Sequence, residues 1–324
     1  MSLRTIIVGT SLTTLSDSTV RTAVAVARAS GAAVWLVHVC APASLPPEAR
    51  KNDDPWMLGR HLEALRSRLA DQARRTGLAS LPDFHPDQLR VMVGQPAREV
   101  LALAVGMRAD LVVIGPVEGG VLHHIPLGSL ADEVIRKAPC PVLLARSAQD
   151  FPPDRVEIPV DLSPISANAL RQGLDFLAGL GGLPRRTEVL FALSPMELQG
   201  SIQFTAEQME RMSAEELDRF LAANGAGPAP ILRQVVTDFP RSAILNTLED
   251  RQVELVILGT HGRGGFKRLV LGSIASEIAR HARCNVLLVP PSPLPASRRS
   301  RGGTGRWLAA SPGADYPAAA SSYR

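Results

Sequence analysis

Cysteine is scarce in this chain, and its positions argue against two classes of protein. Only 3 of the 324 residues are cysteine, too few for the disulfide framework that holds small secreted domains together. Cys40, Cys140 and Cys284 form no C-x-x-C pair and no histidine–cysteine ligand set. We therefore expect no disulfide framework and no metal site.

Long apolar runs are also missing. No run reaches the ~18 residues of a membrane-spanning helix, and the start MSLRTIIVGT has too short an apolar stretch for a signal peptide. The apolar content of 45% is nevertheless enough for two hydrophobic cores. We expect a cytoplasmic protein that does not bind membranes.

An excess of one charge is missing from most of the chain. The formal net charge is +4, with 35 basic and 31 acidic residues, but five arginines and one aspartate lie in residues 291–324. The remainder holds 30 residues of each sign, so the broad basic surface of a nucleic-acid-binding domain is not expected. Residues 291–324 are rich in Pro, Ser, Gly and Ala, and we expect a disordered tail there.

The sequence contains the same pattern twice. Three pairs of residues are separated by 144 positions: Gly115 and Gly259, Gly128 and Gly272, and Cys140 and Cys284. A repeat of this length is a duplicated domain, because solenoid repeats have periods of roughly 20–50 residues. We predict one domain over residues 1–147 and a second over 154–290, joined near the FPPD run at 151–154.

Strand-like and helix-like segments alternate in both halves. Apolar strands such as Leu111–Ile114 and Leu255–Leu258 are typical of a parallel sheet covered on both faces. The pattern predicts two doubly wound α/β domains in tandem, each with five parallel strands. The last strands, Val142–Ala145 and Val286–Val289, are the candidates for a seam between the halves, which would make the chain an intramolecular pseudo-dimer. Pro159 conflicts with the strand Val156–Val160, and we expect it at the strand exit, where pairing has ended.

The most informative segment is GTHGRGGFKRLVLGS, Gly259–Ser273, which lies between a predicted strand and a predicted helix. Its spacing is G-x2-G-x9-G-S, with glycines at Gly259, Gly262 and Gly272. Glycine permits positive φ and lets a ligand approach the backbone closely. Backbone N–H groups in such a turn, and at the start of the following helix, bind anions. The segment therefore predicts a site for the phosphates of a nucleotide.

This spacing, with its flanking strand, its helix and the apolar segment after Cys284, resembles the nucleotide loop of the universal stress protein family. The resemblance implies an adenine nucleotide α-hydrolase-like fold with flavodoxin-like layering, and ATP as the ligand, with Mg²⁺ bridging its phosphates. It also implies that Asp161 lies near the nucleoside, where an ionised carboxylate accepts hydrogen bonds from ribose hydroxyls. The predicted nucleotide-binding residues are Pro159, Asp161, Gly259, Gly262, Arg263, Gly264, Gly265, Gly272 and Ser273.

Several of these residues also have simpler interpretations. Asp161 is a possible turn or cap residue, and Ser273 a possible helix cap. Arg263 is either a phosphate ligand or a solvated loop residue. We interpret His261 as positional, because no acidic partner lies at a fixed spacing from it. The whole segment could also be a glycine-rich connection without a ligand.

The first half differs from the second at the positions that matter for phosphate. In its segment GPVEGGVLHHIPLGS, Glu118 stands where the second half has Gly262, and we align Gly9 with Asp161. A carboxylate repels each phosphate charge at about 4 Å by roughly 1 kcal/mol in water, and by more at a lower dielectric. His123 and His124 would offset this only if protonated. We expect ATP in the second half and a degenerate site in the first.

Three functions fit these features. The first is a nucleotide-responsive stress regulator that binds ATP and is not a turnover enzyme, because no Walker lysine follows the glycines. The second is a slow ATPase or adenylyl-transferring enzyme on the same fold. The third is an interaction module without a nucleotide. A homodimer and an unknown protein partner are compatible with all three.

Overall fold

A computed structural model of the chain describes residues 3–46, 55–115, 128–146, 151–196, 204–226, 230–261 and 271–291. These residues belong to one unit, Met1–Ser292. The tail predicted over 291–324 lies outside the described residues, apart from its first position. In the described ranges no helix is long and apolar enough to cross a membrane.

Five strands and their helices form each half, in the order that the sequence predicts. The first half contains β1 (Thr5–Gly9), α1 (Thr14–Ser30), β2 (Ala33–Cys40), α3 (Pro55–Arg75), β3 (Leu89–Val93), α4 (Pro96–Gly106), β4 (Leu111–Ile114), α5 (Ser129–Lys137) and β5 (Val142–Leu144). The second contains β6 (Arg155–Val160), α6 (Pro164–Gly179), β7 (Arg186–Leu193), α8 (Ala206–Ala223), β8 (Ile231–Thr237), α9 (Pro240–Asp250), β9 (Leu255–Gly259), α10 (Ser273–His281) and β10 (Asn285–Val289). Short 3-10 helices are η1 (Pro42–Ser44), η2 (Leu78–Ser80) and η3 (Pro86–Gln88).

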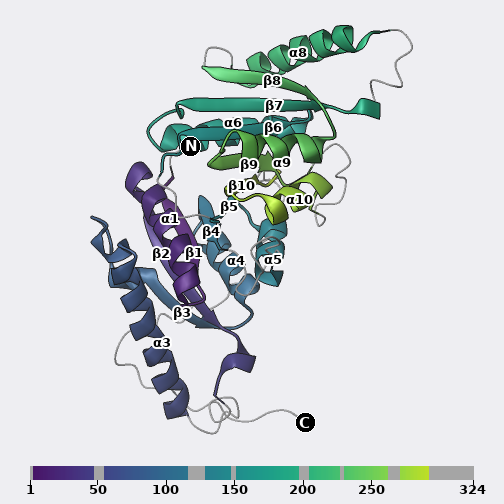
Figure 1. Cartoon of the computed structure of the whole chain (residues 1–324). Coiled ribbons are helices and arrows are strands. Elements are labelled where there is room, and N and C mark those ends of the chain that lie inside the picture. The colour runs from purple at the N-terminus through teal and green to yellow at the C-terminus, as the bar shows by residue number, and fades with distance from the viewer. Residues whose placement is uncertain are drawn as a thin grey trace, which may run out of the picture. The chain divides into compact units, whose positions relative to one another are not determined.

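All ten strands belong to one sheet, in the order β3-β2-β1-β4-β5-β10-β9-β6-β7-β8 (Figure 1). The five strands of each half pair in parallel. The halves join where β5 and β10 pair antiparallel, with Leu143 opposite Leu287. The predicted α/β fold is confirmed, and the two predicted final strands do form the seam.

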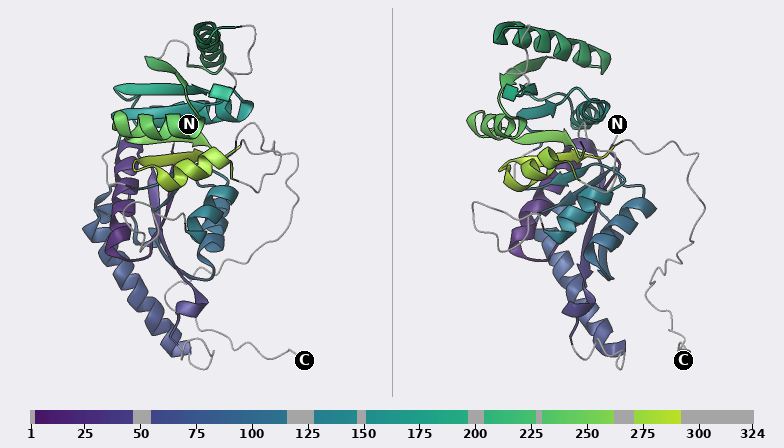
Figure 2. Two further views of the ribbon diagram at one scale, coloured as in Figure 1. Left: turned by 45° about the vertical axis from the view of Figure 1, so that its right-hand side comes forward. Right: turned by 90° about the vertical axis from the view of Figure 1, so that its right-hand side faces the viewer.

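Helices cover both faces of the strands in each half (Figures 1 and 2). Buried residues of α1, α3, α6 and α8 form one core with the strands, and those of α4, α5, α9 and α10 form the other. Every residue of β4 is buried, as expected for a strand covered on both sides. Strand order reverses between β1 and β4, and again between β6 and β9, so ligand sites are expected at the carboxyl ends of these pairs.

Cys140 and Cys284 are packing residues, as the sequence suggests. Both are unoxidised and 5% exposed. Burial raises the pKa of each thiol to about 12, so both remain protonated and unreactive at neutral pH.

Pro159 lies inside β6 and not beyond its end. The register of β6 with β7 continues to Val160, so the expectation that pairing has ended is wrong on that side. On the other side the register with β9 stops at Glu157. The carbonyl of Arg155 faces β9, and backbone groups alternate in direction along a strand, so the side of Pro159 that lacks an N–H also faces β9. No ladder hydrogen bond is lost there.

Candidate functional site

In the second half, the two ends of the glycine-rich segment are hydrogen-bonded to each other. Thr260, directly after β9, donates its N–H to the carbonyl of Val289 at 2.9 Å. Its own carbonyl accepts from the N–H of Gly272 at 2.8 Å. These bonds bring the start of α10 to the carboxyl end of β9. Thr260 and Gly272, which flank residues 261–271 in the sequence, therefore lie together at one of the two positions where strand order reverses.

Among the described residues, no side chain caps the N-terminus of α10. Gly272 is the N-cap, with φ and ψ of −57° and 145°. Ser273, the first helical residue, is exposed and is not the cap. The N–H groups of an uncapped first turn are available to an anion, and the helix dipole favours negative charge there.

Glycine serves a different purpose here from the one that the sequence suggests. Neither Gly259 nor Gly272 has a positive φ, so the expectation of left-handed backbone is wrong at these two positions. A Cβ on Gly259 would lie 3.2 Å from Cγ2 of Ile165 and 3.6 Å from Cβ of Ala169. Gly259 is therefore explained by the close packing of α6 on β9.

Asp161 follows β6, next to β9 in the sheet, and forms part of a turn. Its Oδ1 accepts the N–H of Ser163 at 3.0 Å, and Ser163 is the N-cap of α6. The turn interpretation is thus correct for one carboxylate oxygen. Because the carboxyl ends of adjacent parallel strands lie at the same edge of a sheet, Asp161 and Thr260 lie at that edge together.

Gly262, Arg263, Gly264 and Gly265 lie outside the described residues, as do Glu118, His123 and His124. Their predicted roles stay predictions.

His261, directly after Thr260, is buried and uncharged. Its Nδ1 lies 2.9 Å from Oγ1 of Thr260, and burial lowers its pKa. Its Nε2 has no hydrogen-bond partner among the described residues. The positional role of His261 stays a prediction.

The hydrogen bonds at the amino ends of the strands correct the alignment of the two halves. Asp110 donates its N–H to the carbonyl of Thr5, and Glu254 donates its N–H to that of Arg155. Asp110 and Glu254 differ by 144 positions, so Thr5 and Arg155 are equivalent and differ by 150. The halves therefore have one offset at β1 and β6 and another at β4 and β9.

The equivalent of Asp161 in the first half is consequently Ser11, and the alignment with Gly9 is wrong. Gly9 corresponds to Pro159. A leucine with positive φ, 63° in the first half and 62° in the second, follows Ser11 and Asp161, which supports the new alignment. The first half thus has a neutral hydroxyl where the second has a carboxylate.

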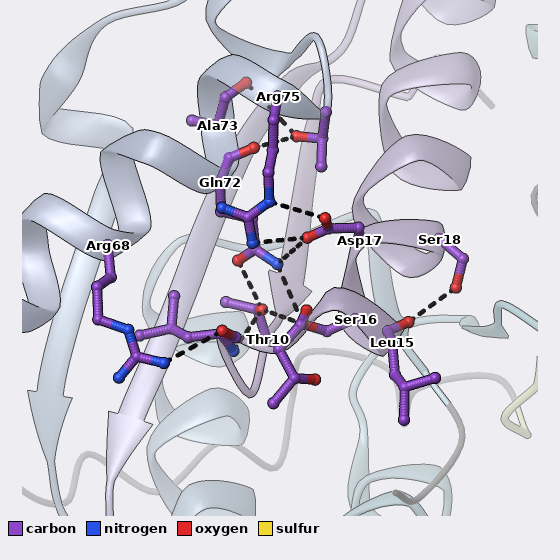
Figure 3. Close-up of polar contacts among 12 residues, drawn as sticks. Thr10, Leu15, Ser16, Asp17, Ser18, Arg68, Gln72, Ala73 and Arg75 are labelled. Atoms are coloured by element: carbon purple, nitrogen blue, oxygen red, sulfur yellow. Dashed lines mark hydrogen bonds and ion pairs between the residues drawn. The ribbon is translucent and has the colours of Figure 1, made fainter.

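A polar network that the sequence analysis missed holds α3 against α1 in the first half (Figure 3). Gln72 donates to Oδ1 of Asp17 at 2.8 Å and to Oγ of Ser16 at 3.0 Å. Arg75 makes two hydrogen bonds to Asp17, at 2.8 and 2.9 Å. Thr10 donates to Oε1 of Gln72 at 2.7 Å. The second half has Val160 and Ala167 in place of Thr10 and Asp17, so it lacks these two members of the network.

We predict that Arg75→Ala destabilises the protein by about 1–3 kcal/mol, because it leaves a buried carboxylate with fewer donors. Burial raises the pKa of Asp17, but the hydrogen bonds from Arg75 and Gln72 lower it overall. The stabilisation should therefore be present at neutral pH and lost as the pH falls below the ordinary aspartate pKa of 3.8. Urea unfolding measures this. Arg74→Ala, which removes an exposed pair with Asp71, should cost less than about 1 kcal/mol; equal effects would contradict the prediction.

These features define a class of protein: a tandem doubly wound α/β protein with a candidate anion site where strand order reverses. A family model described as the universal stress protein family matches residues 2–146 and 153–290. The chain belongs to this family.

Two relatives and one solved structure illustrate the similarity. A universal stress protein of Mycolicibacterium smegmatis is 27% identical over 303 residues, covering 88% of this chain and 97% of the relative. One of Mycobacterium tuberculosis is 29% identical over 198 residues, covering 58% of this chain but only 64% of the relative's length. The crystal structure of a universal stress protein from Archaeoglobus fulgidus superimposes with a TM-score of 0.62 at 16% identity, covering 88% of this chain and 98% of that one. This last similarity concerns the fold alone.

Proposed function

We propose that the second half binds ATP and that the chain is a nucleotide-responsive stress regulator. The observation that carries the proposal is the bond from Gly272 to Thr260, which brings the uncapped start of α10 to the end of β9. Asp161 lies at the same edge of the sheet. An anion-binding helix start and a carboxylate at one sheet edge suit the phosphates and the ribose of a nucleotide.

The proposed roles follow from this arrangement. The phosphates bind at the first turn of α10, with Ser273, Gly262, Gly264 and Gly265 around them, and Arg263 pairs with a phosphate oxygen. The ribose hydroxyls donate to the carboxylate of Asp161. Mg²⁺ accompanies the phosphates as their counterion, since Mg²⁺ is commonly bound through phosphates and waters.

The first half is proposed not to bind ATP. Ser11 replaces Asp161, and Glu118 replaces Gly262, so one ribose acceptor is weakened and a negative charge is added near the phosphates. The absence of a Walker lysine favours a binding protein over a turnover enzyme. A cytoplasmic location, a homodimer and a protein partner stay predictions.

The test is to denature the purified full chain and identify the released nucleotide by chromatography. We expect close to one ATP per chain, lost in Gly262→Glu and unchanged in Glu118→Gln. A second equivalent in Glu118→Gly would show that this glutamate closes the first half. If the chain releases no nucleotide and a titration at millimolar ATP also shows no binding, the proposal is wrong. ADP production exceeding one per chain would favour the ATPase instead.

A further inference from the structure

The first half contains a pocket of about 510 Å³ at the carboxyl ends of β1, β2 and β4. This volume is typical of small-molecule sites. Its walls are largely apolar, and no aspartate or glutamate is among the described residues that line it. The polar side chains that line it come from the turn after β1 and from α1, β2, η1 and α3. Two of them, His38 and Arg68, offer a ligand an acceptor and a positive charge.

Thr19 presents a buried hydroxyl without a partner. The residue is 0% exposed, it lines the pocket, and its Oγ1 has no hydrogen-bond partner among the described residues. Its equivalent in the second half is Ala169. An unsatisfied buried hydroxyl costs about 1–3 kcal/mol. The hydroxyl lies against Gly115 at the end of β4, where a Cβ would come within 2.2 Å of Oγ1. By contrast, Thr10 and Ser16, which also line the pocket, are already bonded in the network with Gln72 (Figure 3).

His38 presents a hydrogen-bond acceptor to the pocket. Its Nδ1 lies 2.9 Å from the carbonyl of Thr10, and a carbonyl only accepts, so Nδ1 carries the proton. Burial lowers the pKa of His38, and the positive charge of Arg68 adds to the effect, so the ring is neutral at neutral pH. Nε2 is then a lone-pair acceptor. Phe191 is the equivalent residue on β7, so the second half has no such acceptor.

Arg68 is the only permanently charged side chain among the described residues that line the pocket. It extends from α3, and its Nη2 donates to the carbonyl of Leu12 at 3.3 Å (Figure 3). No carboxylate pairs with it in the described part of the chain, and a guanidinium has five donors. The Asp17–Gln72–Arg75 network fixes α3, which holds Arg68 at the edge of the pocket.

We propose that this pocket binds a small organic monoanion with an apolar body. Its anionic group pairs with Arg68, a hydrogen-bond donor on its body bonds Nε2 of His38, and the apolar walls cover the rest. Among the described residues that line the pocket, one arginine is the sole permanent charge, which suits a ligand with one negative charge. The first half would thus be a second ligand site of different specificity, and this inference does not depend on ATP binding in the second half.

The test is calorimetric titration of the full chain with four monoacids, benzoate, 4-hydroxyphenylacetate, indole-3-acetate and octanoate, and with the neutral amide of the tightest binder. We expect at least one acid to bind once per chain. Its amide should bind at least about tenfold more weakly than the acid. Arg68→Ala should weaken the acid by about tenfold or more, and Ser11→Asp, which adds a carboxylate at the pocket, should also weaken it. Arg66→Ala, on the same helix but outside the pocket lining, is the matched control and should leave affinity unchanged.

Three results would overturn the proposal. The first is that none of the four acids binds at millimolar concentration, and the second is that the amide binds as tightly as its acid. The third is that Arg66→Ala weakens binding as much as Arg68→Ala does. Displacement of the acid by ATP would show that the two ligands share one site and would overturn the assignment of a separate site to the first half. If ATP does not bind to the chain, the titrations with the acids, the amide and the arginine variants still test this proposal.

Discussion

Ser273→Asp should weaken ATP binding by at least about tenfold without destabilising the fold. The aspartate would stand at the first position of α10, where the dipole stabilises a negative side chain by about 0.3–1 kcal/mol. The same charge repels a phosphate at about 4 Å by roughly 1–4 kcal/mol, depending on the local dielectric. Calorimetric titration with ATP and a thermal unfolding curve measure the two effects separately.

The first half offers a matched control for this variant. Ser129 has the equivalent place on α5, follows an uncapped glycine N-cap with extended φ and ψ, and is exposed. Ser129→Asp should leave ATP affinity unchanged. If Ser129→Asp weakens ATP as much as Ser273→Asp does, the phosphates do not bind at α10 alone, and the asymmetric account is wrong.

Glu157 should make the protein less stable as the pH rises from about 4.5 to 8. It lies on β6, is 0% exposed, and neither carboxylate oxygen has a hydrogen-bond partner among the described residues. Burial raises its pKa from 4.5 to about 8, although the positive charge of Arg251 partly opposes this. The neighbouring Glu188, opposite Glu157 in the register, is the one that pairs with Arg251.

The sign follows from proton binding. Between these pH values the folded chain keeps the proton of Glu157 while the unfolded chain releases it, so rising pH favours unfolding. Protonated Glu157 makes its full contribution to the free energy of unfolding below about pH 4.5. Roughly 3 kcal/mol of that contribution is lost by pH 7. Above about 8 both states are ionised and the loss levels off. Urea unfolding across this range measures the slope.

Glu157→Gln should remove this slope, because the amide does not titrate. Its stability should equal or exceed that of the unmodified chain at pH 8 and should not exceed it at pH 4. Glu249→Gln, which removes an exposed carboxylate paired with Arg283, controls for the loss of one acidic group. An unchanged slope in Glu157→Gln would show that Glu157 does not hold the proton.

The regular elements could be predicted because the local patterns and the tertiary structure agree. Leu111–Ile114 is a strand as predicted, and the strand predicted over Leu255–Leu258 extends to Gly259. A continuous run of apolar residues that is as long as a typical strand indicates a strand covered on both faces. The duplication then predicts the same five-stranded unit twice, and the seam through β5 and β10 follows from the position of the last strands.

The alignment at the site could not be predicted with the same accuracy. The offset of 144 fits the later strands, whereas β1 and β6 differ by 150, and only strand pairing reveals the change. Sequence reasoning therefore compared Gly9 with Asp161, although Ser11 is the equivalent. Glu157 is not among the residues that the sequence analysis singles out, and its burial follows from the helices that cover both faces of the sheet.

The pocket of the first half was missed for a related reason. His38 and Arg68 stand 30 positions apart and form no motif in the sequence, and only the fold brings β2 and α3 together at the pocket. A comparison of His38 with Phe191, and of Thr19 with Ala169, would have indicated that this half has its own polar groups, but both comparisons require the corrected register.

The most direct test of the central claim is a calorimetric titration of nucleotide-free full chain with ATP, which counts the sites. The account predicts one site per chain, abolished by Gly262→Glu, weakened by Asp161→Ala and by Ser273→Asp, and unaffected by Ser129→Asp. Two equivalent sites, no binding at millimolar ATP, or a single site that persists in Gly262→Glu would contradict it.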